Sequence, residues 1–112
     1  MKKSLLFLFV ICFFLSCSTE KKKQAPTVLL TEPQMIDVMT DVEIMEGIIS
    51  YKRNANQKTE YLKIVGYDTL FAHYGITDSI FKENISYYYS IEPQTFTNIL
   101  DSVEMRLSKM KN

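Results

Sequence analysis

The sequence has little of the chemistry on which metal sites and common active sites depend. Its 112 residues include one histidine, His73, and two cysteines, Cys12 and Cys17. A zinc site needs three or four protein ligands, so a single histidine far from both cysteines predicts no metal site. No Ser-His-acid arrangement or phosphate-binding loop is recognisable. We therefore expect no metal and no cofactor, and the sequence favours a non-enzymatic role without excluding an enzyme.

Excess charge of either sign is also missing. The chain has 13 basic and 13 acidic residues, which gives a formal net charge of zero. Nucleic-acid-binding domains usually carry a basic surface and a pI above about 9. We therefore expect no nucleic-acid partner.

The longest apolar run lies at the N-terminus and is too short to cross a bilayer. It extends from Leu5 to Leu15, whereas a membrane-spanning helix needs roughly 20 apolar residues. Lys2 and Lys3 precede the run, and Ser16 ends it with a small residue. These three parts predict a secretory signal peptide over residues 1–16.

The junction Ser16-Cys17 resembles a bacterial lipobox. In such signals the chain is cut before the cysteine, which is then lipidated. The resemblance implies that Cys17 carries the lipid, that Cys12 is removed with the signal, and that no disulfide remains. Residues 17–30 then form the lipidated cysteine and a tether, and residues 31–112 form the domain.

Residues 31–112 have the periodicity of helices and no sustained alternation typical of strands. The expected helices cover residues 31–50, about 59–74, about 78–89, and from Pro93 onwards, with a polar loop at 51–58. Thr31 and Gln34 form a capping-box pattern, Gly75 favours a helix end, and Thr77 is a typical N-cap. The sequence predicts an all-α fold, a single small domain of about four helices.

Two stretches of the chain match a known family. Met35, Asp37 and Asp41 fit a Met-x-Asp-aliphatic-aliphatic-x-Asp helix, and Glu46 stands at an acid that often follows. The second stretch contains Tyr74, Gly75, Ile76, Phe81, Tyr87 and Tyr88. Over roughly Pro26 to Leu107 the chain is similar to small Bacteroidota lipoproteins classed as domain of unknown function 4296. The resemblance implies a helical envelope lipoprotein and no particular activity, and Asn84 stands where serine is usual.

Location and modification follow from the same resemblance. Surface-exported Bacteroidota lipoproteins tend to carry several acids after the cysteine, whereas here Glu20 is followed by three lysines. We therefore expect attachment to the cell envelope at the outer membrane, facing the periplasm. Three Asp-Ser/Thr-aliphatic triplets look like O-glycosylation sequences of that group, with acceptors at Thr69, Ser79 and Ser102.

Glu46 is the side chain that the helical pattern makes most unusual. On an ideal helix it lies between Met35 and Met39, within the apolar stripe. A buried carboxylate must be paired or hydrogen-bonded, so Glu46 is either a structural acid or part of a ligand site. For the structural case we expect a tyrosine hydroxyl, Asn84 or Arg106 as its partner.

Three classes of function remain open from the sequence. Glu46, Asn84, Tyr87, Tyr88 and Asp41 are the candidates for a polar core or a ligand site. We favour an envelope lipoprotein that binds a protein or peptide partner. The alternatives are a small enzyme or ligand-binding protein that uses Glu46 and nearby tyrosines, and a purely structural envelope lipoprotein.

Overall fold

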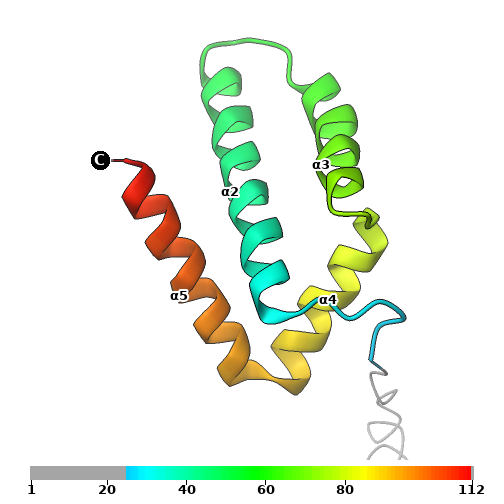
Figure 1. The fold of residues 1–112 in the computed structure, drawn as a ribbon. Helices are drawn as coiled ribbons and strands as arrows, with labels where there is room; N and C mark the ends of the chain where they lie inside the picture. The colour runs from blue at the N-terminus through cyan, green and yellow to red at the C-terminus, as the bar shows by residue number, and fades with distance from the viewer. Residues whose placement is uncertain (1–24, 112) are drawn as a thin grey trace, which may run out of the picture.

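The computed structural model describes residues 25–111, which form four α-helices and one π-helical segment without a strand. The elements are α2 (Glu32–Asn54), η1 (Leu62–Gly66), α3 (Tyr67–His73), α4 (Asp78–Ile91) and α5 (Pro93–Met110). Helix α2 lies in the centre with α3 on one side and α5 on the other, and α4 crosses below them (Figure 1). The predicted all-α domain of four helices is confirmed.

The predicted helix ends form as expected from local hydrogen bonding. The Gln34 N–H donates to the Thr31 hydroxyl at 3.3 Å, and the Thr31 N–H donates to the Gln34 side chain at 2.8 Å. The Ile80 N–H donates to the Thr77 hydroxyl at 3.3 Å. Gly75 follows α3 with φ of 69°, a left-handed conformation that glycine adopts without steric cost. Each cap satisfies backbone groups that a helix end leaves unpaired.

The first helix is longer than predicted. The segment Tyr51–Asn54 belongs to α2, so the expectation of a polar loop from residue 51 is wrong. Lys52 and Arg53 are good helix formers, and their positive charges interact favourably with the carbonyl end of the helix. The helix ends before Asn56, which has φ of 58°; asparagine visits this left-handed region more readily than most residues.

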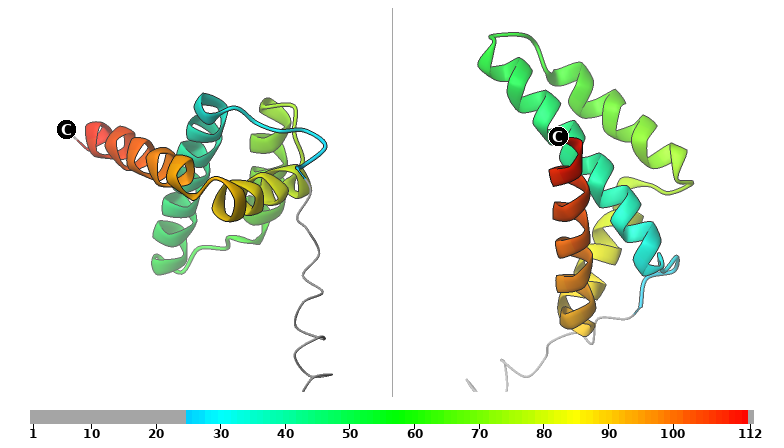
Figure 2. Two further views of the ribbon diagram at one scale, coloured as in Figure 1. Left: turned by 90° about the horizontal axis from the view of Figure 1, so that it is seen from below. Right: turned by 60° about the vertical axis from the view of Figure 1, so that its left-hand side comes forward.

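The core lies where α2 meets the other helices. Met35, Val38 and Ile99 have no exposed surface, and Val103 is also buried. Helix α5 crosses α2 along the half of α2 that contains Met35 and Val38 (Figure 2). The remaining buried apolar members of the cluster are Leu30, Phe71, Ile76 and Tyr88.

The N-terminal predictions fall on residues that the structure does not describe. The signal peptide at 1–16, Cys17 and the first part of the tether lie outside residues 25–111. Within the described residues, no helix combines the length and the apolar character needed to cross a membrane.

Candidate functional site

An apolar groove lies between α2 and the η1–α3 segment. Its volume is about 400 Å³, and it is open to solvent along one side. Its lining residues are Asp41, Ile44, Met45, Ile48, Tyr61, Leu62, Val65, Gly66, Thr69 and Leu70. Ile48, Tyr61 and Val65 are 43%, 74% and 39% exposed. The groove therefore presents apolar side chains to solvent near the end of the domain that carries the loop 55–59.

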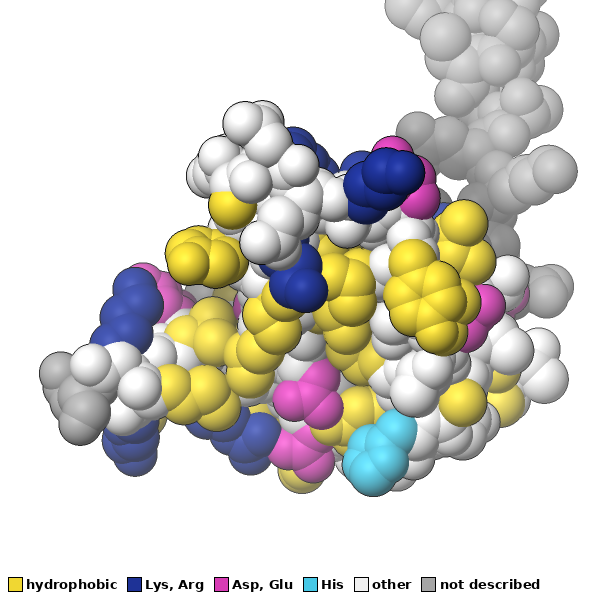
Figure 3. Space-filling model, turned by 90° about the horizontal axis from the view of Figure 1, so that it is seen from above, with side chains coloured by type: hydrophobic (Ala, Val, Ile, Leu, Met, Phe, Trp, Pro, Cys, Tyr) yellow, Lys and Arg dark blue, Asp and Glu magenta, His cyan; other side chains and the backbone are white. Residues whose placement is uncertain are grey.

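The surface at this end is largely hydrophobic. Seen from above, hydrophobic side chains form a band across the middle of the face, with some basic and acidic side chains among them and others at the edges (Figure 3). Ile64, 66% exposed, and the groove residues Ile48 and Val65 belong to the elements that form this end. Contiguous exposed apolar surface of this kind marks interaction sites more often than the scattered apolar residues of an ordinary surface.

Gly66 gives the groove its depth on the η1 side. A Cβ atom at this position would lie 3.2 Å from the Met45 methyl carbon and 3.3 Å from its sulfur. The missing side chain lets Met45 lie across the floor of the groove. Methionine is flexible and polarizable, so this floor can adapt its shape to a bound apolar group. The adjoining π-helical turn is a form often found at functional sites.

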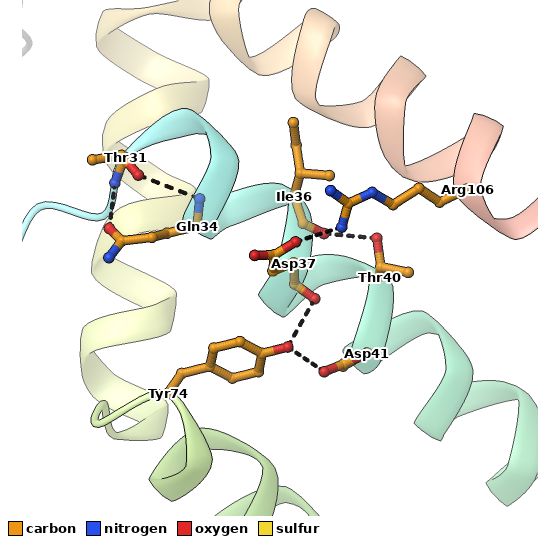
Figure 4. Close-up of polar contacts among 8 residues, drawn as sticks. All are labelled: Thr31, Gln34, Ile36, Asp37, Thr40, Asp41, Tyr74 and Arg106. Atoms are coloured by element: carbon orange, nitrogen blue, oxygen red, sulfur yellow. Dashed lines mark hydrogen bonds and ion pairs between the residues drawn. The ribbon is translucent and has the colours of Figure 1, made fainter.

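Asp41, which lines the groove, belongs to a set of polar contacts between helices (Figure 4). The Tyr74 hydroxyl donates to the Asp41 carboxylate and lies 3.4 Å from the backbone oxygen of Asp37. The Asp37 carboxylate forms an ion pair with Arg106 of α5 at 2.5 Å. These contacts join α3, α2 and α5 in one line and fix the position of the Asp41 carboxylate.

Glu46 is exposed, and the prediction that it faces the core is wrong. It accepts a hydrogen bond from the Tyr67 hydroxyl of α3. The expected tyrosine partner is therefore present, and it lies in the predicted helical region of residues 59–74. Arg106, another expected partner, pairs with Asp37. A carboxylate at the edge of the α2–α3 contact keeps its hydration and needs no buried partner.

The two tyrosine–carboxylate contacts affect the ionisation of the tyrosines. Burial, followed by the hydrogen bond to Asp41, raises the pKa of Tyr74 to about 12. Burial and the hydrogen bond to Glu46 also raise the pKa of Tyr67. In both cases the phenolate is disfavoured because it would lose solvent and face a carboxylate.

The raised pKa of Tyr74 predicts an alkaline loss of stability. A group whose pKa is higher in the folded state stabilises that state fully below its unfolded pKa, about 10 for tyrosine. That contribution is lost as the pH rises from about 10 to about 12. We expect Tyr74→Phe to lower the free energy of unfolding by about 1 kcal/mol at neutral pH and to weaken this alkaline loss.

Urea unfolding at neutral and alkaline pH measures both effects. Tyr51→Phe is the matched control, because Tyr51 is 75% exposed. Equal alkaline losses in wild type and Tyr74→Phe would show that Tyr74 does not carry the predicted ionisation.

Asn84 and Tyr88 bind the chain segment that precedes α2. Asn84 is fully buried; its side-chain amide donates to the backbone oxygens of Val28 and Ile80, both at 2.8 Å, and its oxygen accepts from the Leu30 N–H at 2.8 Å. The Tyr88 hydroxyl donates to the Leu30 backbone oxygen. We call these contacts the clasp. They lie on α4 and share no residue with the groove lining, so the predicted candidates do not form one site.

Of the other candidate residues, Thr69 lines the groove together with Asp41, and Tyr87, Ser79 and Ser102 lie outside its lining. Tyr87 is partly buried, with its ring edge-on to Tyr88 at 5.4 Å. Thr69 and Ser79 are exposed, and Ser102 is partly buried. Among the described residues, no group of three or more His, Cys, Asp or Glu could hold a metal ion.

The groove was not predicted from the sequence, although Asp41 was a candidate. Ile44 and Ile48 follow Asp41 at helical spacing but lie beside the predicted core stripe of α2. Val65 has the same spacing to Tyr61 and Thr69 on the facing segment. A second apolar stripe on a helix that already has one is the signal that would have indicated an additional contact surface.

Comparison with known proteins gives a family but no activity. No curated protein and no solved structure matches the chain. The family described as "Domain of unknown function (DUF4296)" matches residues 26–112. That range covers most of the sequence and includes all the described helices, and the resemblance to this domain family drawn from residues 35–46 and 74–88 is confirmed. The chain belongs to this family of domains of unknown function.

Proposed function

We propose that the chain is a lipid-anchored envelope protein whose helical domain binds an amphipathic helix of a partner protein. The observation that carries the proposal is the open apolar groove between α2 and the η1–α3 segment. The proposed location is the periplasmic side of the outer membrane, with Cys17 as the anchor. The domain then acts as an interaction module and not as an enzyme.

The groove suits a helix because helices form both of its walls. On α2 the lining positions are Asp41, Ile44, Met45 and Ile48, which follow one another by three, one and three residues. The facing wall repeats this spacing from Tyr61 to Leu70. A third helix can place side chains between two such rows, as in the helix-in-groove mode of peptide recognition.

Charge in the groove indicates the polarity of the partner. Of the residues that line the groove, Asp41 alone is charged. Its carboxylate accepts the Tyr74 hydroxyl, but a carboxylate has about four acceptor positions and can bind a further donor. We therefore expect a partner helix with apolar residues at i, i+3, i+4 and i+7 and a lysine or arginine next to Asp41.

The anchor has its own test, because its residues lie outside the described domain. The signal pattern and Ser16-Cys17 support it. We expect Cys17→Ala to abolish lipidation and to release the protein from the membrane fraction. Mass spectrometry of the mature N-terminus and membrane fractionation measure this; an intact Met1 in the wild-type protein, or a free Cys17 thiol, would refute the anchor.

Photo-crosslinking from the groove tests the binding function. A photoreactive amino acid at Ile48 or Val65 lies in the groove, and one at Glu104 of α5 is an exposed control outside the lining. In intact cells we expect the two groove positions, but not Glu104, to crosslink to a discrete envelope protein. Asp41→Lys should reduce that crosslink, because it places a positive charge next to the lysine or arginine expected in the partner.

Three results would count against the groove. Equal crosslinking from Glu104 would indicate non-specific contact. Adducts with lipid alone would indicate an acyl-chain site. The absence of any adduct at both groove positions, with the protein folded and at the membrane, would favour a purely structural lipoprotein.

A further inference from the structure

We propose that the end of the domain bearing Val28, Leu29 and Ile91 rests on the lipid surface, so that the groove points away from the membrane. This inference depends on the proposed anchor at Cys17 but not on the partner of the groove. The surface that this end of the domain contacts is the interfacial region of a phospholipid bilayer.

The chain enters the domain at the end opposite the groove. The segment 25–31 and the junction of α4 with α5 lie at the lower end in Figure 1 and in the right-hand view of Figure 2, whereas the loop 55–59 lies at the upper end. The clasp fixes the entry point, because Asn84 and Tyr88 bind backbone groups of Val28 and Leu30. Asn84 is fully buried, so the entering chain is part of the folded core and cannot swing freely around the domain.

The distance from the anchor is short compared with the domain. Eight residues lead from Cys17 to Ala25, the first residue described, and they can span at most about 29 Å when fully extended. Helix α2 has 23 residues and is about 35 Å long. A lipid at Cys17 therefore holds the entry end of the domain within about 29 Å of the bilayer, whereas the upper end of α2 can lie farther away.

Apolar side chains are exposed at the entry end. Val28 and Leu29 are 43% and 47% exposed, and Ile91 is 51% exposed. Ile91 follows Tyr88 by three residues and lies on the same side of α4 as the clasp. Burial of these side chains among lipid headgroups and upper acyl chains removes apolar surface from water.

Acidic side chains lie beside the apolar ones at this end. Glu32 begins α2 beside the clasp, and Glu92 follows Ile91. Both acids are near enough to Tyr88 to raise the pKa of its hydroxyl, after the larger effect of burial. These acids repel an anionic bilayer, whereas the three lysines after Glu20 attract one, so we expect the contact to depend on the apolar side chains and to form on a zwitterionic lipid surface.

Nitroxide labels at single cysteines test this orientation. The mature protein, lipidated at Cys17, has no other cysteine once Cys12 is removed. Leu29→Cys and Ile91→Cys each place a label at the entry end, and Lys58→Cys places one on the exposed loop at the groove end. The lipidated protein is incorporated into phosphatidylcholine vesicles. We then compare relaxation of each label by oxygen, which concentrates in lipid, with relaxation by a water-soluble nickel complex.

We expect a several-fold higher oxygen-to-nickel ratio at Leu29 and Ile91 than at Lys58. Equal ratios at all three positions, on vesicle-bound protein, would overturn the orientation while leaving the anchor intact. Protection of Leu29 and Ile91 from both reagents would identify a protein contact, such as a second copy, and would also overturn it. A protein that does not float with the vesicles would overturn the anchor and the orientation together, whereas none of these results bears on binding in the groove.

Discussion

Replacement of Asn84 by alanine is expected to cause a large loss of stability. The Leu30 N–H would lose its buried acceptor, and the Val28 and Ile80 backbone oxygens would each lose a donor. A buried polar group left without a partner costs about 1–3 kcal/mol. We therefore expect Asn84→Ala to lower the free energy of unfolding by about 2–5 kcal/mol, a large share of the stability of a small domain.

Two further variants distinguish the hydrogen bonds of Asn84 from the space that it fills. Asn84→Asp has nearly the same volume but, when ionised, cannot donate to the Val28 oxygen. Its burial should raise the pKa of the new carboxyl, so part of the lost stability should return as the pH falls towards the unfolded value of about 4. Glu83→Ala, an exposed change on the same helix, should stay within about 0.5 kcal/mol of wild type.

Chemical unfolding followed by circular dichroism measures these variants. If Asn84→Ala were as stable as Glu83→Ala, the clasp would contribute nothing to the fold, and the chain before α2 would not be held. If Asn84→Asp were as stable as wild type at every pH, the prediction that the Asn84 amide stabilises the fold as a hydrogen-bond donor would be wrong.

The second large effect is expected at Ile99. This residue of α5 has no exposed surface and belongs to the cluster that contains Met35 and Val38 of α2. Truncation of a fully buried isoleucine removes contacts and leaves a cavity, which costs about 2–5 kcal/mol. We expect Ile99→Ala to fall in this range, measured by thermal and urea unfolding.

The adjacent Leu100 provides the control for Ile99. Leu100 is 42% exposed, so Leu100→Ala should cost less than about 1 kcal/mol by the area that it buries. A larger loss for Leu100→Ala than for Ile99→Ala would show that α5 packs against α2 through a different side.

Local chemistry was enough to predict the helices and most of their ends. Thr31 with Gln34, Thr77 and Gly75 act through neighbours within a few residues, and all three form as predicted. The end of α2 was misjudged because Tyr51–Asn54 are polar but still suited to a helix. Polarity marks exposure, and an exposed stretch is a loop only when it also has turn residues such as Asn56.

The surroundings of Glu46 and of the groove depend on tertiary contacts that a helical pattern does not contain. Helical spacing places Glu46 beside Met35 and Met39, yet α5 covers the lower half of α2 and only the η1–α3 segment lies near Glu46. Ile44 and Ile48 are apolar as core residues are, but they line a groove that is open to solvent. An apolar stripe indicates that contact is favourable, and only the fold determines which contact is made.

Binding of one face of a partner helix in the groove is tested by the spacing of the crosslinked residues in that partner. Photoreactive groups at Ile48 and Val65, one on each wall, should react with partner residues separated by three, four or seven positions, next to a lysine or arginine. Mass spectrometry of the crosslinked peptides reads this spacing. Crosslinks to alternate residues of an extended segment, or scattered without a helical period, would contradict the account.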